Sequence, residues 1–193
     1  MSLNHATPDG GVPPELKRFG GRVGLVRPLR AGDESQLQEF FRSHTAETVY
    51  ERYGCLISTM TAERASQLVN VDQSRDCALG IFEPTPDGEK LHAVGRYCLD
   101  PDGKSAELAF VVRETLRHQG MATILLERLI RTARDRRLAR LWAQVNAQNA
   151  AMLGIFRRHG FTISPQPDIG MMQATLVLGK AAAQVPAGKK KAR

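Results

Sequence analysis

The sequence predicts one α/β (α+β) domain with a mixed, mostly antiparallel sheet flanked by helices. The chain of 193 residues is long enough for one hydrophobic core and too short for two. Two turn sequences, at 83–90 and 101–104, connect three successive strand-like stretches, as expected for antiparallel hairpins. Two helical stretches then alternate with two further strand-like stretches, which is why helices are expected against the sheet.

The expected domain covers residues 21–180 and lies between two tails. Residues 1–20 are rich in glycine, proline and polar residues without periodicity, which is typical of a disordered tail. Residues 181–193 end in GKKKAR and are predicted to form a basic, disordered tail. At the start of the domain, Val23 and Leu25 alternate as in a strand.

Three helices are expected after this first strand. In AGDESQLQEFFRSH, Asp33 stands at an N-cap position with a glutamine three residues later. Leu37, Phe40 and Phe41 follow at helical spacing. TAETVYERYG is predicted to form a short second helix, and TAERASQLVNV a third that begins at Thr61.

The hydrophobic period changes after the third helix. Residues 77–82 are predicted to form an apolar strand, 91–100 its return strand, and 105–113 a third strand. The turn at 83–90 contains Asp-Gly, which suits positive backbone angles. Three antiparallel strands in succession are therefore expected.

A long amphipathic helix follows the third of these strands. Its apolar face consists of Ile124, Leu125, Leu129, Ile130 and Ala133. After it we expect a strand in LARLWAQVN, a helix in NAAMLGIFRRHG that ends at Gly160, and a last strand in MMQATLVL.

Composition and charge narrow the classes of partner. The net charge of +7 favours anionic partners, but part of it lies in the C-terminal tail, and charge alone selects no partner. With one Trp, three Tyr and seven Phe, mostly in apolar runs, no specific nucleic-acid binding is expected. Neither a signal sequence nor an apolar run of about 20 residues is present, so we expect a cytoplasmic protein without membrane insertion. The three cysteines have no metal-ligand spacing and are expected to be reduced.

The hexapeptide RHQGMA at 117–122 has the features of an anion site. A strand that continues into a helix through a glycine presents unpaired N–H groups and the positive end of the helix dipole. A pyrophosphate fits such a place. Gly120 would allow close approach of the backbone, and Arg117 adds a charge at the rim. Taken alone, however, a single glycine at a helix entry is more often an ordinary turn.

Together with the order of the elements around it, this loop resembles that of the Gcn5-related N-acetyltransferase (GNAT) family. Arg117-x-x-Gly120-x-Ala122 matches the family's Arg/Gln-x-x-Gly-x-Gly/Ala acetyl-CoA loop, and the helix from Asn149 to Gly160-Phe161 matches the following helix. The resemblance spans about 23–178 and implies the GNAT acyl-CoA N-acyltransferase fold. VRPLRAGDESQLQEFF and SAELAFVVR are similar in particular to the acetyltransferase domain of bacterial protein-lysine acetyltransferases.

The resemblance implies an acetyl-CoA site. In the family, the strand before the loop splays from the next one, and the pantetheine arm bonds to its free backbone groups. One amide of that stretch would face the thioester carbonyl and stabilise the oxyanion. Here Phe110, Val111 and Val112 would supply the backbone groups, Asn149 and Phe156 would border the distal arm of the cofactor, and the pyrophosphate would lie on Arg117, His118, Gln119, Gly120, Met121 and Ala122.

Glu107 is the candidate general base. A lysine ε-amine, with a pKa of about 10.4, is almost wholly protonated at pH 7 and must lose a proton before it attacks a thioester. Glu107 stands alone in the apolar run AELAFVV, on the same strand face as Ala109 and Val111, where apolar surroundings would raise its pKa. Considered alone, Glu107 is better interpreted as a residue that faces solvent or pairs with an arginine. The resemblance favours the base, because related protein acetyltransferases place a glutamate base on this strand.

Other residues have weaker claims. Many family members carry a tyrosine as general acid where this sequence has Phe156, so water would protonate the departing thiolate. His118 and His159 are interpreted as structural. The segment 45–70, with Tyr50 and Tyr53, is the candidate acceptor side. The arginines after the loop are interpreted as a solvated helix face, with the cofactor's 3′-phosphate as an alternative partner: Arg131, Arg134, Arg136, Arg137 and Arg140.

The hypothesis is an acetyl-CoA-dependent N-acetyltransferase that transfers the acetyl group directly, without a metal or a covalent enzyme intermediate. The acceptor is a protein lysine or a small amine, and the protein is a monomer or homodimer. A catalytically silent CoA-sensing or partner-binding module is a second hypothesis, which Phe156 supports and Glu107 opposes. A nucleic-acid binder, the third, requires binding that survives removal of residues 181–193.

Overall fold

The computed structural model describes residues 11–53, 59–167 and 170–179, with the side chains of residues 50–53 left out. These residues form one eight-stranded sheet in the order β1-β2-β3-β4-β5-β6-β8-β7. All neighbouring strands are antiparallel except the parallel pair β5 and β6. The strands are β1 (Glu15–Phe19), β2 (Arg22–Pro28), β3 (Cys77–Thr85), β4 (Gly88–Leu99), β5 (Ser105–Val112), β6 (Arg140–Asn146), β7 (Thr162–Pro165) and β8 (Met171–Val177). The expected mixed, mostly antiparallel sheet is confirmed.

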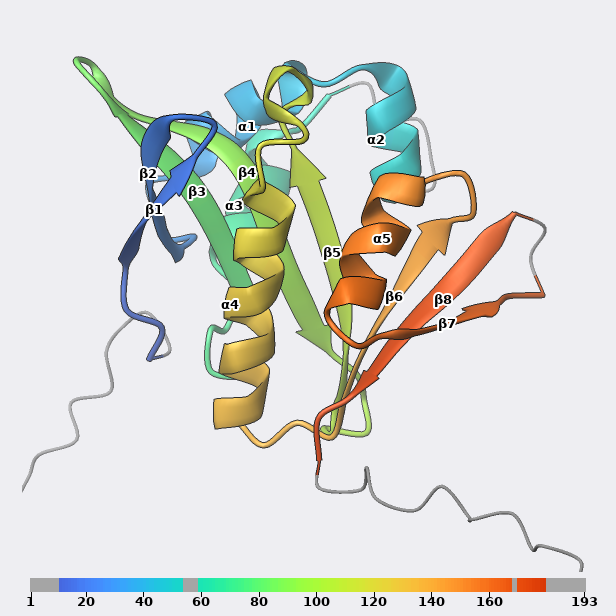
Figure 1. The fold of residues 1–193 in the computed structure, drawn as a ribbon. Coiled ribbons are helices and arrows are strands. Elements are labelled where there is room, and N and C mark those ends of the chain that lie inside the picture. The colour runs from blue at the N-terminus through green and yellow to red at the C-terminus, as the bar shows by residue number, and fades with distance from the viewer. Residues whose placement is uncertain (1–10, 54–58, 168–169, 180–193) are drawn as a thin grey trace, which may run out of the picture.

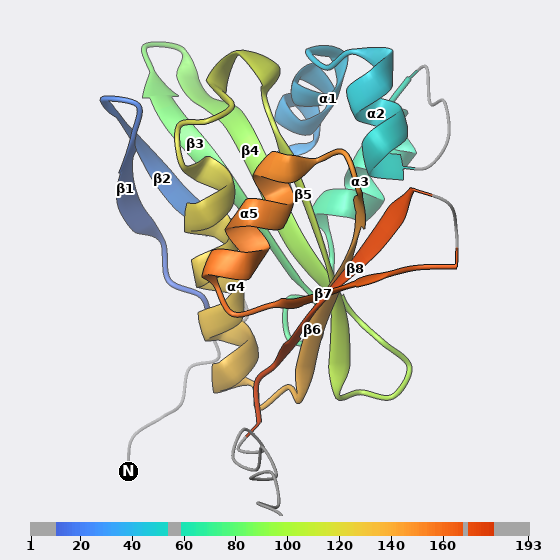
Figure 2. The same ribbon diagram turned by 45° about the vertical axis from the view of Figure 1, so that its right-hand side comes forward.

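Helices cover both faces of this sheet (Figures 1 and 2). Helices α1, α2 and α3 lie on one face, and α4 and α5 on the other. Each face has its own buried apolar cluster, one under α4 and α5 and one under α1 to α3. The helices are α1 (Glu34–Arg42), α2 (Ala46–Tyr53), α3 (Ala62–Val69), α4 (Met121–Asp135) and α5 (Ala150–Arg158), with a short 3-10 turn at Glu114–Leu116.

The sheet begins earlier in the chain than expected. Part of the range 1–20, expected to be a disordered tail, forms β1 and pairs with β2. The turn between them uses Gly20 and Gly21 at φ of 49° and 81°. Phe19 is 3% exposed, and Glu15 accepts a hydrogen bond of 2.8 Å from the buried Arg128 of α4. Contacts with distant residues therefore order a segment whose own pattern is weak.

The two predicted helix starts, at Asp33 and Thr61, are found, but only Thr61 makes the capping hydrogen bond. The Thr61 side chain caps α3 by accepting from the Arg64 amide at 3.1 Å. Asp33 precedes α1, but its carboxylate makes no cap hydrogen bond. Instead it accepts two bonds of 2.8 Å from the buried guanidinium of Arg27, which explains why the cap is not made.

Helix α5 ends at a Schellman motif, as the position of Gly160 predicted. Gly160 has φ +82°, and its amide bonds to the Arg157 carbonyl at 3.1 Å. The Phe161 amide bonds to the Phe156 carbonyl, also at 3.1 Å, and the two rings pack 4.7 Å apart. These two hydrogen bonds and the ring contact define the motif. They turn the chain back into β7, a short edge strand that the sequence pattern did not predict.

Candidate active site

A gap opens between β5 and β6 along the sheet. Their ladder consists of three residue pairs and ends at Glu107 and Trp142. Beyond this pair the two strands diverge, and α5 lies in front of the opening (Figure 1). On its other side, β5 stays paired with β4 as far as Val112. Residues 108–112 therefore present one strand edge to the gap, where an extended ligand can pair as an added strand would.

The loop after β5 ends at a helix start of the kind expected. Gly120 precedes α4 with φ +85°, a left-handed conformation that favours glycine. The amides of the first turn of a helix have no acceptor within the helix, and the dipole places positive potential there. Met121 is 1% exposed, so its side chain anchors the loop in the core. The backbone, rather than the Met121 side chain, is the part of the loop available to an anion.

Gln119 contacts the β1–β2 turn. Its side-chain amide packs so closely on Gly20 that a Cβ there would overlap it unless the Gln119 side chain moved. The Gln119 Oε1 atom is buried and has no hydrogen-bond partner among the described residues. The unexpected strand β1 thus supports the loop through its turn.

Arg117 reaches toward α2. Its guanidinium donates a hydrogen bond of 2.8 Å to the Thr48 hydroxyl. Thr48 donates in turn to Glu114 Oε1 at 2.7 Å, and the same oxygen accepts from the Thr45 amide at 2.8 Å. This threonine–Glu114 cluster, made of Thr45, Thr48, Glu114 and Arg117, fastens the loop to the segment expected on the acceptor side. Sequence reasoning missed Glu114 and Thr48, because 66 residues separate them.

The cluster makes a pH-dependent contribution to stability. Hydrogen bonds from the Thr45 backbone and the Thr48 hydroxyl lower the pKa of the Glu114 carboxyl to about 2. A lowered pKa in the folded state stabilises the fold above the ordinary value of 4.5, and this contribution is lost as the pH falls toward 2. We expect Glu114→Gln to lower the melting temperature at pH 7, by a difference from wild type that shrinks between about pH 4.5 and pH 2. Thermal unfolding followed by circular dichroism measures it, and a difference independent of pH would contradict this role.

Glu107 lies at the point where the gap begins. It is half-buried and stands between Cys98 of β4 and Trp142 of β6 in the register. Side chains alternate along β5: Phe110 and Val112 pack toward the α4 side, and Val111 toward the α1–α3 side. By the period of two, Glu107 shares the face of Val111. The site faces the helices of the expected acceptor side.

The two candidates on the α5 side lie at opposite ends of one helical segment. Asn149 caps α5 and accepts from the Met152 amide at 3.0 Å. Phe156 is 1% exposed, and its ring lies 6.2 Å from that of Phe110, which belongs to the open stretch of β5. Their contact with a cofactor stays a prediction.

Several secondary candidates have structural contacts. The Nδ1 atom of His159 lies 2.8 Å from the Ile155 carbonyl at the end of α5. Arg136 donates to the Tyr97 hydroxyl at 2.6 Å and to the Asp76 carbonyl at 2.8 Å, so it joins α4 to the sheet. The side chains of Tyr50 and Tyr53 lie outside the described residues.

The described residues contain neither a candidate membrane span nor a candidate metal-ligand cluster. No helix in these ranges combines the length and apolar character needed to cross a bilayer. Within the same residues, no three His, Cys, Asp or Glu side chains gather as metal ligands would. Burial raises the pKa of the Cys77 thiol to about 12, which suits an inert core residue.

Comparisons with known proteins agree on one family. Residues 37–161 match the model of the Acetyltransferase (GNAT) family. Acetyltransferase PA5475 of Pseudomonas aeruginosa is 27% identical over 150 residues, which are 77% of this chain and 80% of that protein. The GNAT domain of S. lividans PAT has a similar fold, with a TM-score of 0.75 and 24% identity over 86% of this chain and 97% of that one. The yncA structure from Salmonella typhimurium, determined with acetyl-CoA, has a TM-score of 0.65 and 20% identity over 82% of this chain and 95% of that one.

Proposed function

This chain belongs to the acetyltransferase (GNAT) family and is an acetyl-CoA-dependent N-acetyltransferase, and we propose that it acetylates protein lysines with Glu107 as general base. The observation that carries the assignment of Glu107 is its position at the last residue pair of the β5–β6 ladder. A carboxylate at this point adjoins the strand edge on which the thioester would lie.

The residues present suit acetyl-CoA. The backbone of Phe110, Val111 and Val112 belongs to the diverging part of β5 and would pair with the pantetheine arm. The loop from Arg117 to Ala122 offers the amides of a helix start and a glycine at positive φ, which would receive the pyrophosphate. Asn149 and Phe156 would border the remaining part of the cofactor across the gap.

The chain's own groups would then act in order. Glu107, directly or through a water molecule, takes a proton from the lysine ammonium, and the neutral amine attacks the thioester carbonyl carbon. An amide of the open β5 stretch donates a hydrogen bond to the developing oxyanion. The C–S bond breaks and the thiolate leaves, while the second proton of the amine nitrogen passes to solvent water. Phe156 has no proton to give, so water protonates the thiolate.

A protein lysine is the acceptor that the sequence favours. VRPLRAGDESQLQEFF and SAELAFVVR resemble the acetyltransferase domain of bacterial protein-lysine acetyltransferases. Helices α2 and α3 lie on the face of the sheet that Glu107 shares and would contact the acceptor. A small amine is the alternative acceptor.

Thiol release from acetyl-CoA with a panel of acceptors distinguishes these two classes. We expect turnover with lysine-containing proteins and peptides, acetyl-lysine in the product by mass spectrometry, and none with matched peptides whose lysines are replaced by arginine. Turnover confined to polyamines or other small amines would overturn the protein-lysine assignment and leave the acetyltransferase activity in place.

A further inference from the structure

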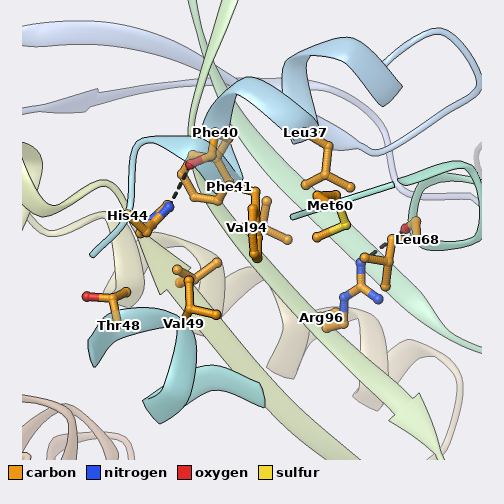
Figure 3. A pocket seen from close by; sticks show the side chains of 11 residues that line it. Leu37, Phe40, Phe41, His44, Thr48, Val49, Met60, Leu68, Val94 and Arg96 are labelled. Atoms are coloured by element: carbon orange, nitrogen blue, oxygen red, sulfur yellow. Dashed lines mark hydrogen bonds between the residues drawn. The ribbon is translucent and has the colours of Figure 1, made fainter. Parts of the chain in front are cut away.

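A small apolar cavity lies beside the open stretch of β5 (Figure 3). Val94 of β4 and Val111 of β5, which are direct neighbours in the register, form its floor. Side chains of α1, α2 and α3 and Met60 line the rest of the cavity. Its volume is about 30 Å³. Because about 10–15 Å³ is enough for one water-sized group, the cavity has room for one or two further carbon atoms of a ligand.

The polar side chains in its wall are largely engaged with the protein. Arg96 donates to the Leu68 carbonyl at 3.0 Å, and Thr48 belongs to the threonine–Glu114 cluster. The Nδ1 atom of His44 lies 2.6 Å from the Phe40 carbonyl, while its Nε2 atom is buried without a hydrogen-bond partner among the described residues. Burial lowers the pKa of His44, which favours its neutral form. An apolar occupant therefore suits this cavity better than a charged one.

The position of the cavity relates it to the acyl group. Val111 is one of the residues whose backbone would hold the thioester, and its side chain points to the α1–α3 face. Thr48 also lines the cavity, and its hydroxyl accepts a hydrogen bond from Arg117 of the loop. This hydrogen bond connects the cavity wall to the loop that would hold the pyrophosphate of the cofactor. An acyl chain longer than acetyl, if it extends toward this face from the thioester, would enter the cavity.

We propose that this cavity receives the acyl chain and that the enzyme accepts propionyl-CoA as well as acetyl-CoA, with a sharp loss for chains of six carbons. This inference rests on the proposed placement of the thioester beside Val111. The occupant it commits to is a short, uncharged acyl chain.

The test compares acetyl-, propionyl-, butyryl-, hexanoyl- and succinyl-CoA by kcat/KM and, independently of turnover, by their Kd in calorimetric titration. We expect propionyl-CoA to lie within about tenfold of acetyl-CoA in kcat/KM, and hexanoyl-CoA to be at least about 100-fold worse. One methylene too many in an apolar pocket changes such ratios by about 10–200-fold.

Two variants change the volume of the cavity, one by filling it and one by enlarging it. Val94→Leu fills the cavity and should lower the propionyl-to-acetyl ratio, in both kcat/KM and affinity, by about tenfold. Leu68→Ala enlarges it at a partly buried position and should improve hexanoyl-CoA relative to acetyl-CoA. Val26→Leu, the same change at a buried valine in the other apolar cluster, should leave these ratios unchanged.

The outcomes separate this inference from the proposed function. Unchanged ratios in Val94→Leu and Leu68→Ala, or a preference for succinyl-CoA over propionyl-CoA, would overturn the acyl cavity while acetyl transfer stands. If acetyl-CoA itself supported no transfer to any lysine acceptor but propionyl-CoA affinity still followed cavity volume, the acceptor assignment would fail and the cavity would stand.

Discussion

Glu107→Gln is expected to lower kcat by about 10²-fold or more, with the Kd for acetyl-CoA within about twofold of wild type. Glutamine has nearly the same shape and still forms hydrogen bonds, but its amide does not take a proton from an ammonium group at neutral pH. The amine would then react only through its small neutral fraction, since its pKa is about 10.4. Steady-state thiol release gives kcat, and calorimetric titration gives the Kd.

The matched control is Asp87→Asn in the β3–β4 turn, which is exposed and belongs neither to the segment 45–70 nor to the loop at 117–122. It should leave kcat unchanged. If Glu107→Gln also left kcat unchanged, Glu107 would not be the base. A loss of activity that only followed a loss of acetyl-CoA binding would make Glu107 a binding or structural residue.

Gly120→Val is expected to weaken acetyl-CoA binding by about tenfold or more. A left-handed conformation costs residues with a side chain about 1–2 kcal/mol, and Gly120 has φ +85° directly before α4. A Cβ there would meet no atom within 4 Å, so steric overlap with the protein does not decide the result. Relief of the backbone strain would turn the loop amides away from the position that a pyrophosphate needs.

Gly103→Val supplies the matched control. Gly103 lies in the β4–β5 turn at φ +64°, also with open space around its Cα. Both variants should lose a few degrees in melting temperature, because each strains one residue. Only Gly120→Val should lose affinity for acetyl-CoA. Equal affinities in the two variants would show that the loop backbone does not hold the cofactor.

Local patterns predicted the elements whose contacts are local. The hairpins of β3, β4 and β5 follow from alternating apolar runs and Asp-Gly turns, and the end of α5 from Gly160. Strand β1 was missed because ELKRF is mostly polar and lies at the sheet edge, where Arg128 of a distant helix secures Glu15. Strand β7 was missed because TISP is short, contains proline and pairs with β8 alone.

In the site, too, local features were predicted from the sequence and contacts between distant residues were not. The glycine at the helix entry is a local feature that the sequence shows directly, although its positive φ was found only in the structure. The gap beside β5 was predicted from the family resemblance alone, because the spacing of residues in a sequence does not indicate where the pairing of two strands ends. The direction of the Arg117 side chain was not foreseen, because its partner Thr48 is 69 residues away. Contacts between α2 and the loop depend on tertiary packing, which a pattern in one segment does not contain.

Direct transfer at the Glu107 face is the central claim, and single-turnover analysis tests it. The enzyme is mixed with an equal amount of acetyl-CoA, with and without a lysine-containing acceptor, and thiol release and acetylated residues are followed together. We expect rapid thiol release only when the acceptor is present, matched one for one by acetyl-lysine on the acceptor. A stoichiometric burst of thiol without acceptor, with the acetyl group on an enzyme side chain that passes it on later, would contradict direct transfer.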